Sequence, residues 1–288
     1  MRYDALYVSK QQVAPMTAVL TSANEIAALI PDGALLALPP EYAPCSMEGI
    51  RALVRRGAKD LRLLGVPQFG FQAELLIGAG CVAEVETAAV TLGELGLAPR
   101  FTEAIKQQKI VMRDTTCPAI HAALQASEKG VPFMPLRGLI GSDILARRED
   151  WRVGDNPFGE NDPIVYLPAI KPDATLFHAA RADVHGNVWI GLRRELMVMA
   201  HASAAAYVSV EEIVEGDLLS DPQTASGTIP GLYVTAIAQE QNGAWPLGVP
   251  HFYERDNEHL AVYADMARTQ DGFDAYIDQW VTRVAAAE

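Results

Sequence analysis

Residues 34–65 read ALLALPPEYAPCSMEGIRALVRRGAKDLRLLG, and this stretch decides the fold class. Two short aliphatic runs, Ala34–Leu38 and Leu61–Gly65, stand on either side of a helical pattern at Met47–Arg56. The apolar side chains of that pattern share one face, and Gly57 follows in the position of a helix C-cap. The order strand, helix, glycine, strand predicts a βαβ unit with parallel strands.

The same alternation continues further along the chain. Ile110–Arg113 is typical of another strand, whereas Pro99–Lys109 and Pro118–Lys129 predict helices with proline near their start. Gly130 closes the second of these helices. The sequence therefore predicts an α/β protein with a single open, mainly parallel sheet and flanking helices.

The second half predicts further strands and helices after a long irregular segment at Gly138–Pro163, which is rich in Gly, Pro, Asp and Asn. Residues 183–187 have the composition of a tight turn between two strands. We find no linker and no repeat, so one domain is expected over residues 1–288. The other expected elements are the strands Ile164–Leu167, Ala174–Ala180, Val188–Gly191 and Ala206–Val210, the helix Leu192–Ala206, and mostly helical structure over Asp256–Ala287.

Composition and charge exclude several classes of function. Half of the 288 residues are hydrophobic and 20% are charged, as in ordinary globular proteins. A net charge of -13 opposes nucleic-acid binding, which depends on clustered Lys and Arg. Met1–Lys10 lacks the features of a secretory leader, and no apolar run approaches the roughly 20 residues of a membrane span. We therefore expect a cytoplasmic protein that binds neither nucleic acid nor membrane.

Short motifs for metals and common cofactors are missing from the sequence. The three cysteines lie far apart without a CxxC pair, so we expect buried, reduced thiols. The six histidines show no HExxH or HxH spacing, which predicts no metal site. Gly78–Gly80 lacks the third glycine of a dinucleotide-binding loop and is interpreted as a turn. No tightly bound cofactor is expected.

Several longer segments stand in an order that resembles one enzyme family. They are GVPFMPLRGLIGSD at 130–143, PDATLFHAARADVHGNVWIG at 172–191 and IPGLYVTAIAQEQNGAWP at 229–246, supported by stretches within 48–86 and 93–104. In this order they resemble the α subunits of family I coenzyme A (CoA) transferases, those of the glutaconate type most closely. Trp245 stands where that family usually has histidine.

The resemblance implies a fold of the NagB/RpiA/CoA transferase type and a transferase that moves CoA between an acyl-CoA and a free organic acid. In that family the nucleophile is a glutamate of the β subunit, which attacks the thioester and then carries CoA as a glutamyl thioester. The resemblance therefore implies a β-type partner subunit, an α2β2 assembly, CoA as a co-substrate, and no nucleophile in this chain.

The segment LALPPEYAPCSM at 36–47 departs from the family pattern. The family has a Gly-Gly-Phe-Gly type of loop here, whose amides approach an oxyanion or carboxylate closely. In this chain Pro39, Pro40 and Pro44 have no N–H to donate, and glycine is absent. Glu41 adds a negative charge unless it points away. We predict that this loop does not form the family's anion-binding cradle and that it reshapes the pocket.

Candidate substrate-binding residues follow from the resembling loop at 137–143. Arg137 has the geometry for a bidentate contact with a carboxylate or phosphate, and the loop glycines allow close approach. The alternative is that Arg137 pairs with an internal acid and the loop is structural. The predicted substrate-binding residues are Arg137, Gly138, Gly141, Ser142 and Asp143.

Two carboxylates are weak catalytic candidates. Glu94 lies in the resembling GELGLAP segment, and Glu240 follows a predicted strand. The alternative for both is a solvated surface carboxylate, because glutamate is rarely buried. Asp183, Gly186 and Asn187 have either a functional role or a structural one. The structural interpretation, stabilisation of a turn, is favoured.

Two other functions remain open. One is a ring-opening hydrolase that acts on a cyclic β-keto acyl-CoA, as in steroid degradation, a branch that resembles these α subunits; the altered 36–47 loop favours it. The other is a non-catalytic paralogue that scaffolds or regulates a partner.

Overall fold

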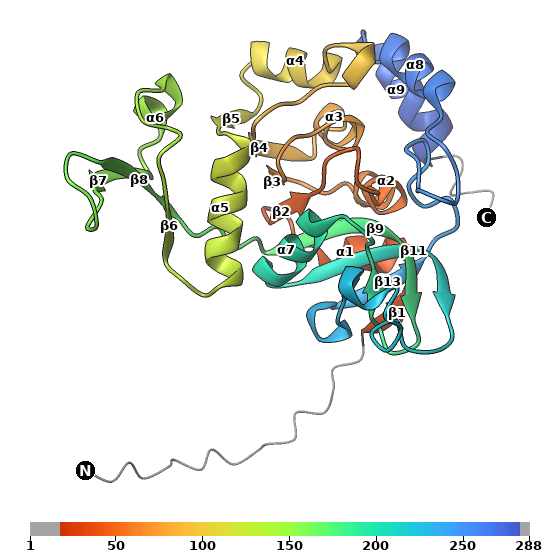
Figure 1. Ribbon diagram of the computed structural model, residues 1–288. Helices are drawn as coiled ribbons and strands as arrows, with labels where there is room; N and C mark the ends of the chain where they lie inside the picture. Colours follow the sequence, from red (N-terminus) through yellow and green to blue (C-terminus); the bar gives the residue numbers. More distant parts are fainter. Residues whose placement is uncertain (1–17, 283–288) are drawn as a thin grey trace.

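The computed structural model describes residues 18–282, and its centre is a twisted open sheet (Figure 1). Neighbouring strands along the main path of this sheet are all parallel. This arrangement confirms the predicted fold class. In spatial order the strands are β1 (Val19–Thr21), β13 (Ala236–Gln239), β11 (Ala206–Val214), β9 (Ala174–Asp183), β2 (Leu35–Leu38), β3 (Leu61–Gly65), β4 (Val82–Thr87) and β5 (Val111–Asp114).

Helices cover both faces of the sheet, and successive strand residues alternate between the two resulting cores. On β2, Leu36 and Leu38 point into the larger core, whereas Ala37 points into the other. The larger core is packed by α1 (Ala23–Leu29), α2 (Met47–Arg56), α3 (Phe71–Gly78), α4 (Pro99–Lys106), α8 (Asn257–Met266), α9 (Gln270–Ile277) and the π-helix η4 (Asp278–Thr282). The other core is packed by α5 (Cys117–Glu128) and α7 (Arg194–Ala202).

The unit β2–α2–β3 forms as its sequence predicts. Gly57 ends α2 with a φ of +68°, and its N–H donates to the carbonyl oxygens of Leu53 and Val54. A side chain with a Cβ is strained in this left-handed conformation, so glycine fits the C-cap. The helix then returns the chain to β3, which pairs with β2 over all four β2 residues.

A second, antiparallel sheet forms an arm that projects from the body at the left of Figure 1. It lies where the sequence predicts an irregular segment, so that expectation for Gly138–Pro163 is wrong in part. Large apolar residues of the arm, including Trp151 and Val165, pack against Ala119 and Ala122 of α5. The arm consists of β6 (Phe133–Leu136), β8 (Pro163–Pro168), β7 (Arg152–Asp155) and α6 (Asp143–Arg147).

Other expectations need smaller corrections. The strand expected to end at Ala180 continues to Asp183, and the helix expected over Leu192–Ala206 is confined to α7. Cys45 and Cys81 are buried as expected, whereas Cys117 is exposed. The C-terminal stretch is mostly helical up to Thr282, and the rest of it, like Met1–Lys10, lies outside the described residues.

The remaining described elements are short. They are β10 (Val188–Trp189), β12 (Thr228–Ile229) and the 3₁₀ turns η1 (Gly93–Leu95), η2 (Ala225–Gly227) and η3 (Gly231–Tyr233). β10 pairs antiparallel with β9, which confirms the predicted turn at 183–187 and its returning strand. Within residues 18–282, no helix has the length and apolar character needed to cross a bilayer.

Candidate active site

The carboxyl ends of the parallel strands meet at one edge of the main sheet. In open α/β sheets this edge is where ligands bind. The loop of residues 39–46 leaves β2 there, and β9 beside it continues past the end of β2, because only Leu36 and Ala37 pair with the start of β9. The loop and the middle of β9 therefore lie side by side at this edge, and the amide of His178 donates to the carbonyl of Pro44 (3.0 Å).

The loop of residues 39–46 is fixed to the body of the protein by its own side chains. The Glu41 carboxylate accepts a hydrogen bond from the Phe71 amide and pairs with Arg255 at 2.7 Å. Its charge is therefore directed toward the start of α3. The Ala43 amide donates to the Pro40 carbonyl (2.9 Å), which makes a turn within the loop. Tyr42 is half exposed, and the Arg193 guanidinium lies 5.1 Å from its ring centroid.

An apolar cavity of about 340 Å³ opens beside this loop, which is within the range of small-molecule sites. Its floor is buried and its rim is exposed or half-buried. The floor consists of Pro44, His178, Ala179, Ala180, Ile190, Leu196 and Val249. The rim consists of Trp189, Gly191, Leu192, Arg193, Pro250 and His251.

A chain of buried hydrogen bonds runs behind the floor of the apolar cavity. His178 Nδ1 lies 2.8 Å from the Ser209 hydroxyl, which lies 2.7 Å from the Ser46 hydroxyl at the start of α2. His178 Nε2 lies 2.8 Å from Glu211 Oε1. Glu211 also accepts from the Tyr253 hydroxyl (2.6 Å) and the Asn242 amide (2.8 Å). The chain thus connects β9 and β11 with the loops on both sides of the cavity.

Within these buried hydrogen bonds, His178 is neutral and Glu211 is ionised. Burial lowers the pKa of His178, so the ring is neutral at pH 7. Burial opposes ionisation of Glu211, but hydrogen bonds from His178 and Tyr253 outweigh it and lower the pKa of this carboxyl. Burial and the bond to Glu211 raise the pKa of Tyr253. A neutral imidazole therefore donates from Nε2 to a carboxylate and accepts at Nδ1.

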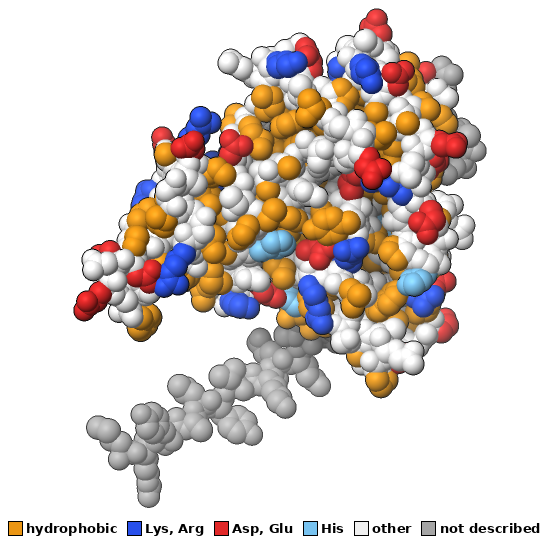
Figure 2. Space-filling view, turned by 45° about the horizontal axis from the view of Figure 1, so that its top comes forward, with side chains coloured by type: hydrophobic (Ala, Val, Ile, Leu, Met, Phe, Trp, Pro, Cys, Tyr) orange, Lys and Arg blue, Asp and Glu red, His pale blue; other side chains and the backbone are white. Residues whose placement is uncertain are grey.

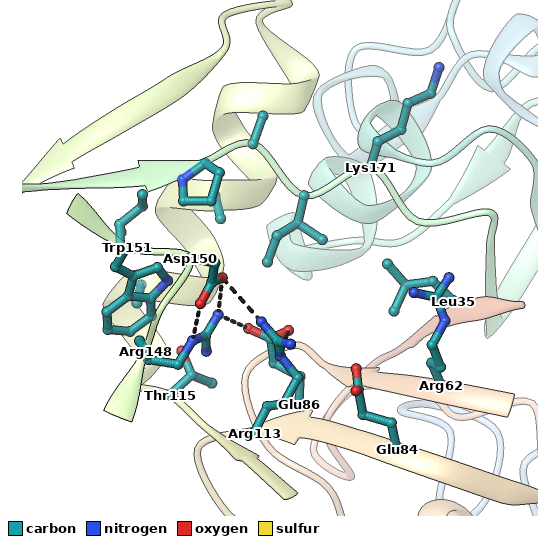
Figure 3. A pocket seen from close by; sticks show the side chains of 16 residues that line it. Leu35, Arg62, Glu84, Glu86, Arg113, Thr115, Arg148, Asp150, Trp151 and Lys171 are labelled. Carbon is teal, nitrogen blue, oxygen red and sulfur yellow. Dashed lines mark hydrogen bonds and ion pairs between the residues drawn. The ribbon is translucent and has the colours of Figure 1, made fainter. Parts of the chain in front are cut away.

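A second cavity, of about 290 Å³, lies between the sheet and the arm and is lined by charged side chains (Figure 3). Arg148, whose side chain is 6% exposed, contacts Asp150 at 2.8 Å and Glu86 at 2.8 Å. Arg113 reaches Asp150 at 3.1 Å. In Figure 3 these four side chains point toward one another, whereas Lys171 points away. The four charges are paired with one another, and the ion pairs attach the arm to β4 and β5.

The residues predicted to bind substrate lie on the arm. Arg137 makes a bidentate contact with Asp162, and its side chain is 67% exposed. The Ser142 hydroxyl donates to the Leu139 carbonyl (2.8 Å), and its oxygen caps α6, where Asp143 occupies the first turn. Gly141 has a φ of +79°. None of these residues, nor Gly138, lines either of the two cavities described above.

The two candidate carboxylates lie in different places. Glu94 is exposed on η1. Glu240 follows β13 and accepts from the Ala23 amide (2.9 Å) at the start of α1. Neither is among the residues that line the apolar cavity.

The turn residues Asp183 and Asn187 stabilise their own loop. The Asp183 carboxylate accepts from the amides of His185 and Asn187 (both 2.9 Å) and from Asn187 Nδ2 (2.8 Å). Gly186 has a φ of +83°. These contacts match the favoured interpretation of this motif.

Sequence reasoning missed the polar groups around the apolar cavity. The histidine spacing concerns His178 only as a metal ligand, and no sequence pattern singles out Glu211, Tyr253 or Arg193. The available signal was a histidine within an otherwise apolar strand pattern, since a buried polar side chain needs a partner. Within residues 18–282, no group of three or more His, Cys, Asp or Glu is arranged to hold a metal ion.

An open parallel sheet with a cavity at its carboxyl edge defines the class of α/β proteins that bind a small molecule at this edge. The profile of the family described as coenzyme A transferase matches residues 20–240, so the chain belongs to this family. Within it, the chain is similar to the A-subunit of glutaconate CoA-transferase from Acidaminococcus fermentans, with 28% identity over 92% of this chain and 88% of that one. This similarity confirms the resemblance to the α-type subunits of the family.

Other relatives show a range of functions and lengths. The chain is 30% identical to an uncharacterized protein of Archaeoglobus fulgidus over 82% of this chain, but it spans only about half (53%) of that relative's length. It is 27% identical to the cholesterol ring-cleaving hydrolase IpdA subunit of Rhodococcus jostii, over 81% of each chain.

Solved structures agree with the fold. The crystal structure of the Acidaminococcus fermentans transferase has a TM-score of 0.85 at 24% identity, over 92% of this chain and 89% of that one. A variant of the decarboxylase AibA/AibB has a TM-score of 0.80 at 29% identity, over 92% of this chain and all of that one. The CoA transferase type of fold predicted from the sequence is confirmed.

Proposed function

We propose that this chain is the α subunit of an enzyme that moves CoA from an acyl-CoA to a free organic acid, and that it works only with a β-type subunit. The apolar cavity is the observation that carries the proposal. It lies at the carboxyl edge where α/β enzymes bind ligands, and none of its described lining residues has a carboxylate. This lining agrees with a glutamate nucleophile that enters the site from another chain, as the family resemblance implies.

The proposed reaction proceeds through covalent intermediates on the partner's glutamate. The glutamate carboxylate of the β-type partner attacks the thioester carbonyl and displaces the CoA thiolate, which leaves a mixed anhydride. The thiolate then attacks the glutamyl carbonyl of the anhydride and releases the first acid as its carboxylate. The second acid takes the CoA from the glutamyl thioester by the same two steps in reverse, so CoA remains a co-substrate. No metal or further cofactor enters these steps.

Exposed apolar side chains support a partner subunit, which we propose to be β-type within an α2β2 assembly. Leu192 at the rim of the apolar cavity is 95% exposed, and Leu97 and Leu232 are 77% and 67% exposed. Figure 2 shows hydrophobic side chains spread over the middle of the body on one face. A contact with a partner subunit would remove such side chains from water. Location in the cytoplasm belongs to the same proposal, because CoA esters are intracellular substrates.

Comparison of the purified chain with its co-expressed complex tests the proposal. We expect no CoA exchange by the chain alone and exchange by the complex. Borohydride should reduce the glutamyl thioester to an alcohol and release CoA, which marks the reacting glutamate on the β-type subunit. Robust exchange by the verified-pure single chain would contradict the need for a partner. A complex that exchanges no CoA with any acyl-CoA would contradict the transferase.

A hydrolase that opens a ring in a cyclic acyl-CoA is a second candidate. Two observations favour it: the proline-rich loop at 39–46, and the similarity to a ring-cleaving hydrolase subunit. The product separates the two functions, because ring opening retains the thioester and adds water across a carbon–carbon bond. A complex that catalyses neither reaction would instead support a scaffolding role.

We also propose that Arg137, Gly138, Gly141, Ser142 and Asp143 contribute to the substrate cleft once the β-type subunit is bound. Arg137 is exposed on an arm that projects from the body, where a partner can reach it. Glu94 and Glu240 remain weak catalytic candidates under the same condition. Substitution of each residue in the complex tests its contribution.

A further inference from the structure

The floor of the apolar cavity has no side chain left to bind a charged group. Its one polar side chain is His178, and both ring nitrogens of His178 are already bonded, to Ser209 and to Glu211. The other six floor side chains are those of Pro, Ala, Ile, Leu and Val. A group that enters this floor therefore meets hydrocarbon on nearly every side.

The charge behind the floor disfavours an anion further. Glu211 Oε1 lies 2.8 Å from Nε2 of His178, a residue of the floor, and the pKa of this carboxyl is lowered. A buried anion without a partner is costly, and a neighbouring carboxylate adds repulsion. Because His178 stays neutral, it supplies no compensating charge.

A cationic side chain lies at the rim of this cavity. Arg193 is half-buried there and lies beside Tyr42 of the 39–46 loop. No ion pair of Arg193 occurs among the described residues. The polar part of an acyl-CoA, with its thioester and pantetheine, therefore matches the rim, whereas the acyl group matches the floor.

We infer that the apolar cavity binds a hydrocarbon acyl group, straight, branched or alicyclic, whose far half carries no charge. The inference rests on the proposed function, because it takes the ligand to be an acyl-CoA. A volume of about 340 Å³ is at the low end of ligand pockets, so the cavity accommodates an acyl group and not the whole of CoA. A dicarboxylic acyl group would bring its second carboxylate to the floor.

Hexanoyl-CoA and adipyl-CoA test the inference, because both acyl groups have six carbons and only adipyl ends in a carboxylate. With the co-expressed complex we expect hexanoyl-CoA to bind more tightly by about tenfold or more, measured by calorimetry, and to have the higher kcat/KM wherever exchange occurs. Equal or tighter binding of adipyl-CoA would overturn the inference. Binding is measured whether or not CoA is exchanged, so a failed transferase assay does not decide the result.

Two variants test whether the floor of the apolar cavity determines the preference for one acyl group over another. Ala180→Leu adds volume beside Val249 and Trp189, so the preference for hexanoyl-CoA over acetyl-CoA should fall by about tenfold. Val249→Ala removes volume at the same place and should raise binding of cyclohexanecarbonyl-CoA relative to hexanoyl-CoA. The second variant decides the question if the first does not fold.

Val85→Ala is the matched control for Val249→Ala, because it removes the same atoms from a fully buried position in the larger core, away from the cavity. It should lower stability without a change in acyl preference. If Ala180→Leu leaves acyl preference unchanged but weakens assembly with the β-type subunit, a partner side chain occupies the cavity and the inference is wrong.

Discussion

The two cavities differ in how their polar side chains are used. Around the charged cavity, Arg148, Asp150, Glu86 and Arg113 neutralise one another and attach the arm to the sheet. Around the apolar cavity, the buried polar groups are bonded behind the floor, and the rim keeps Arg193 free of an ion pair with any described residue. The charges around the charged cavity are therefore satisfied within the protein, whereas the apolar cavity keeps a cation at its rim.

The largest effect is expected from Arg148→Met, which breaks the charged cluster. The change leaves Glu86 and Asp150 without their most buried partner, so the free energy of unfolding should fall by about 3–5 kcal/mol. Urea denaturation of the complex measures this fall. Arg62→Met is the control, because that side chain is 48% exposed and should change stability by only about 0.5 kcal/mol. A stable Arg148 variant that loses substrate binding would make the charged cavity a ligand site.

A smaller loss of stability is expected when the buried hydrogen bonds behind the apolar cavity are broken. In Glu211→Gln an amide replaces an acceptor of three hydrogen bonds, so the free energy of unfolding should fall by about 1–3 kcal/mol. Glu212→Gln is the matched control, since this neighbour is 41% exposed and pairs with Arg181 at the surface. Equal stability of the two variants would show that the buried chain does not hold the cavity together.

The pH dependence of stability should reveal the neutral state of His178. Its pKa is lowered from 6.5 in the folded protein, so below pH 6.5 the unfolded chain takes up a proton that the folded chain refuses. The free energy of unfolding therefore falls as the pH drops, by at most about 1.4 kcal/mol per unit for one proton. Denaturation between pH 7 and pH 5 should show a steeper fall for the unmodified chain than for His178→Gln.

Glu74 changes the pH dependence of stability in the opposite direction to His178. The comparison with His178→Gln is needed to separate the two. Burial raises the pKa of Glu74 to about 7, so its contribution to stability grows as the pH falls from 7 to 4.5. This contribution is the same in the chain with and without His178 and cancels in the difference. Parallel pH profiles for the two proteins would show that His178 binds a proton as readily in the folded protein as in the unfolded chain, so its pKa would not be lowered.

The sequence predicted what depends on local patterns and missed what depends on strand register. The unit β2–α2–β3 and its Gly57 cap follow from periodicity within one stretch of 32 residues, 34–65. The pairing of His178 with Ser209 and Glu211 arises because β9 and β11 align His178 opposite Ser209, 31 positions away in the chain. Periodicity of one segment contains no information on that alignment.

For the candidate site too, the sequence predicts local features and misses contacts between distant segments. The loop at 36–47 was singled out from its own residues, since the loss of N–H donors at proline is a property of the sequence. That Glu41 is directed to Phe71 and Arg255 could not be seen, because these partners come from α3 and from a loop more than 200 residues away. A ligand-bound structure of the complex tests the prediction that this loop holds no oxyanion.

The smallest effect on stability is expected from the two candidate cations, Arg137 and Arg193. Arg137 is 67% exposed and pairs with Asp162, whose pKa it lowers to about 2, while Arg193 has no ion pair with any described residue. Surface pairs contribute little to stability, so Arg137→Met and Arg193→Met should melt within a few degrees of the unmodified complex.

Activity should separate these two cations where stability does not. We expect Arg193→Met to raise KM for an acyl-CoA several-fold, because the lost cation borders the cavity. Arg137→Met should lower turnover of the complex if the arm reaches the cleft that forms with the β-type subunit. Asp162→Asn is the control for Arg137, because it removes the partner and keeps the guanidinium. If Arg137→Met and Asp162→Asn change activity equally, Arg137 acts through the arm's own structure, and Arg193 is left as the cation of the substrate site.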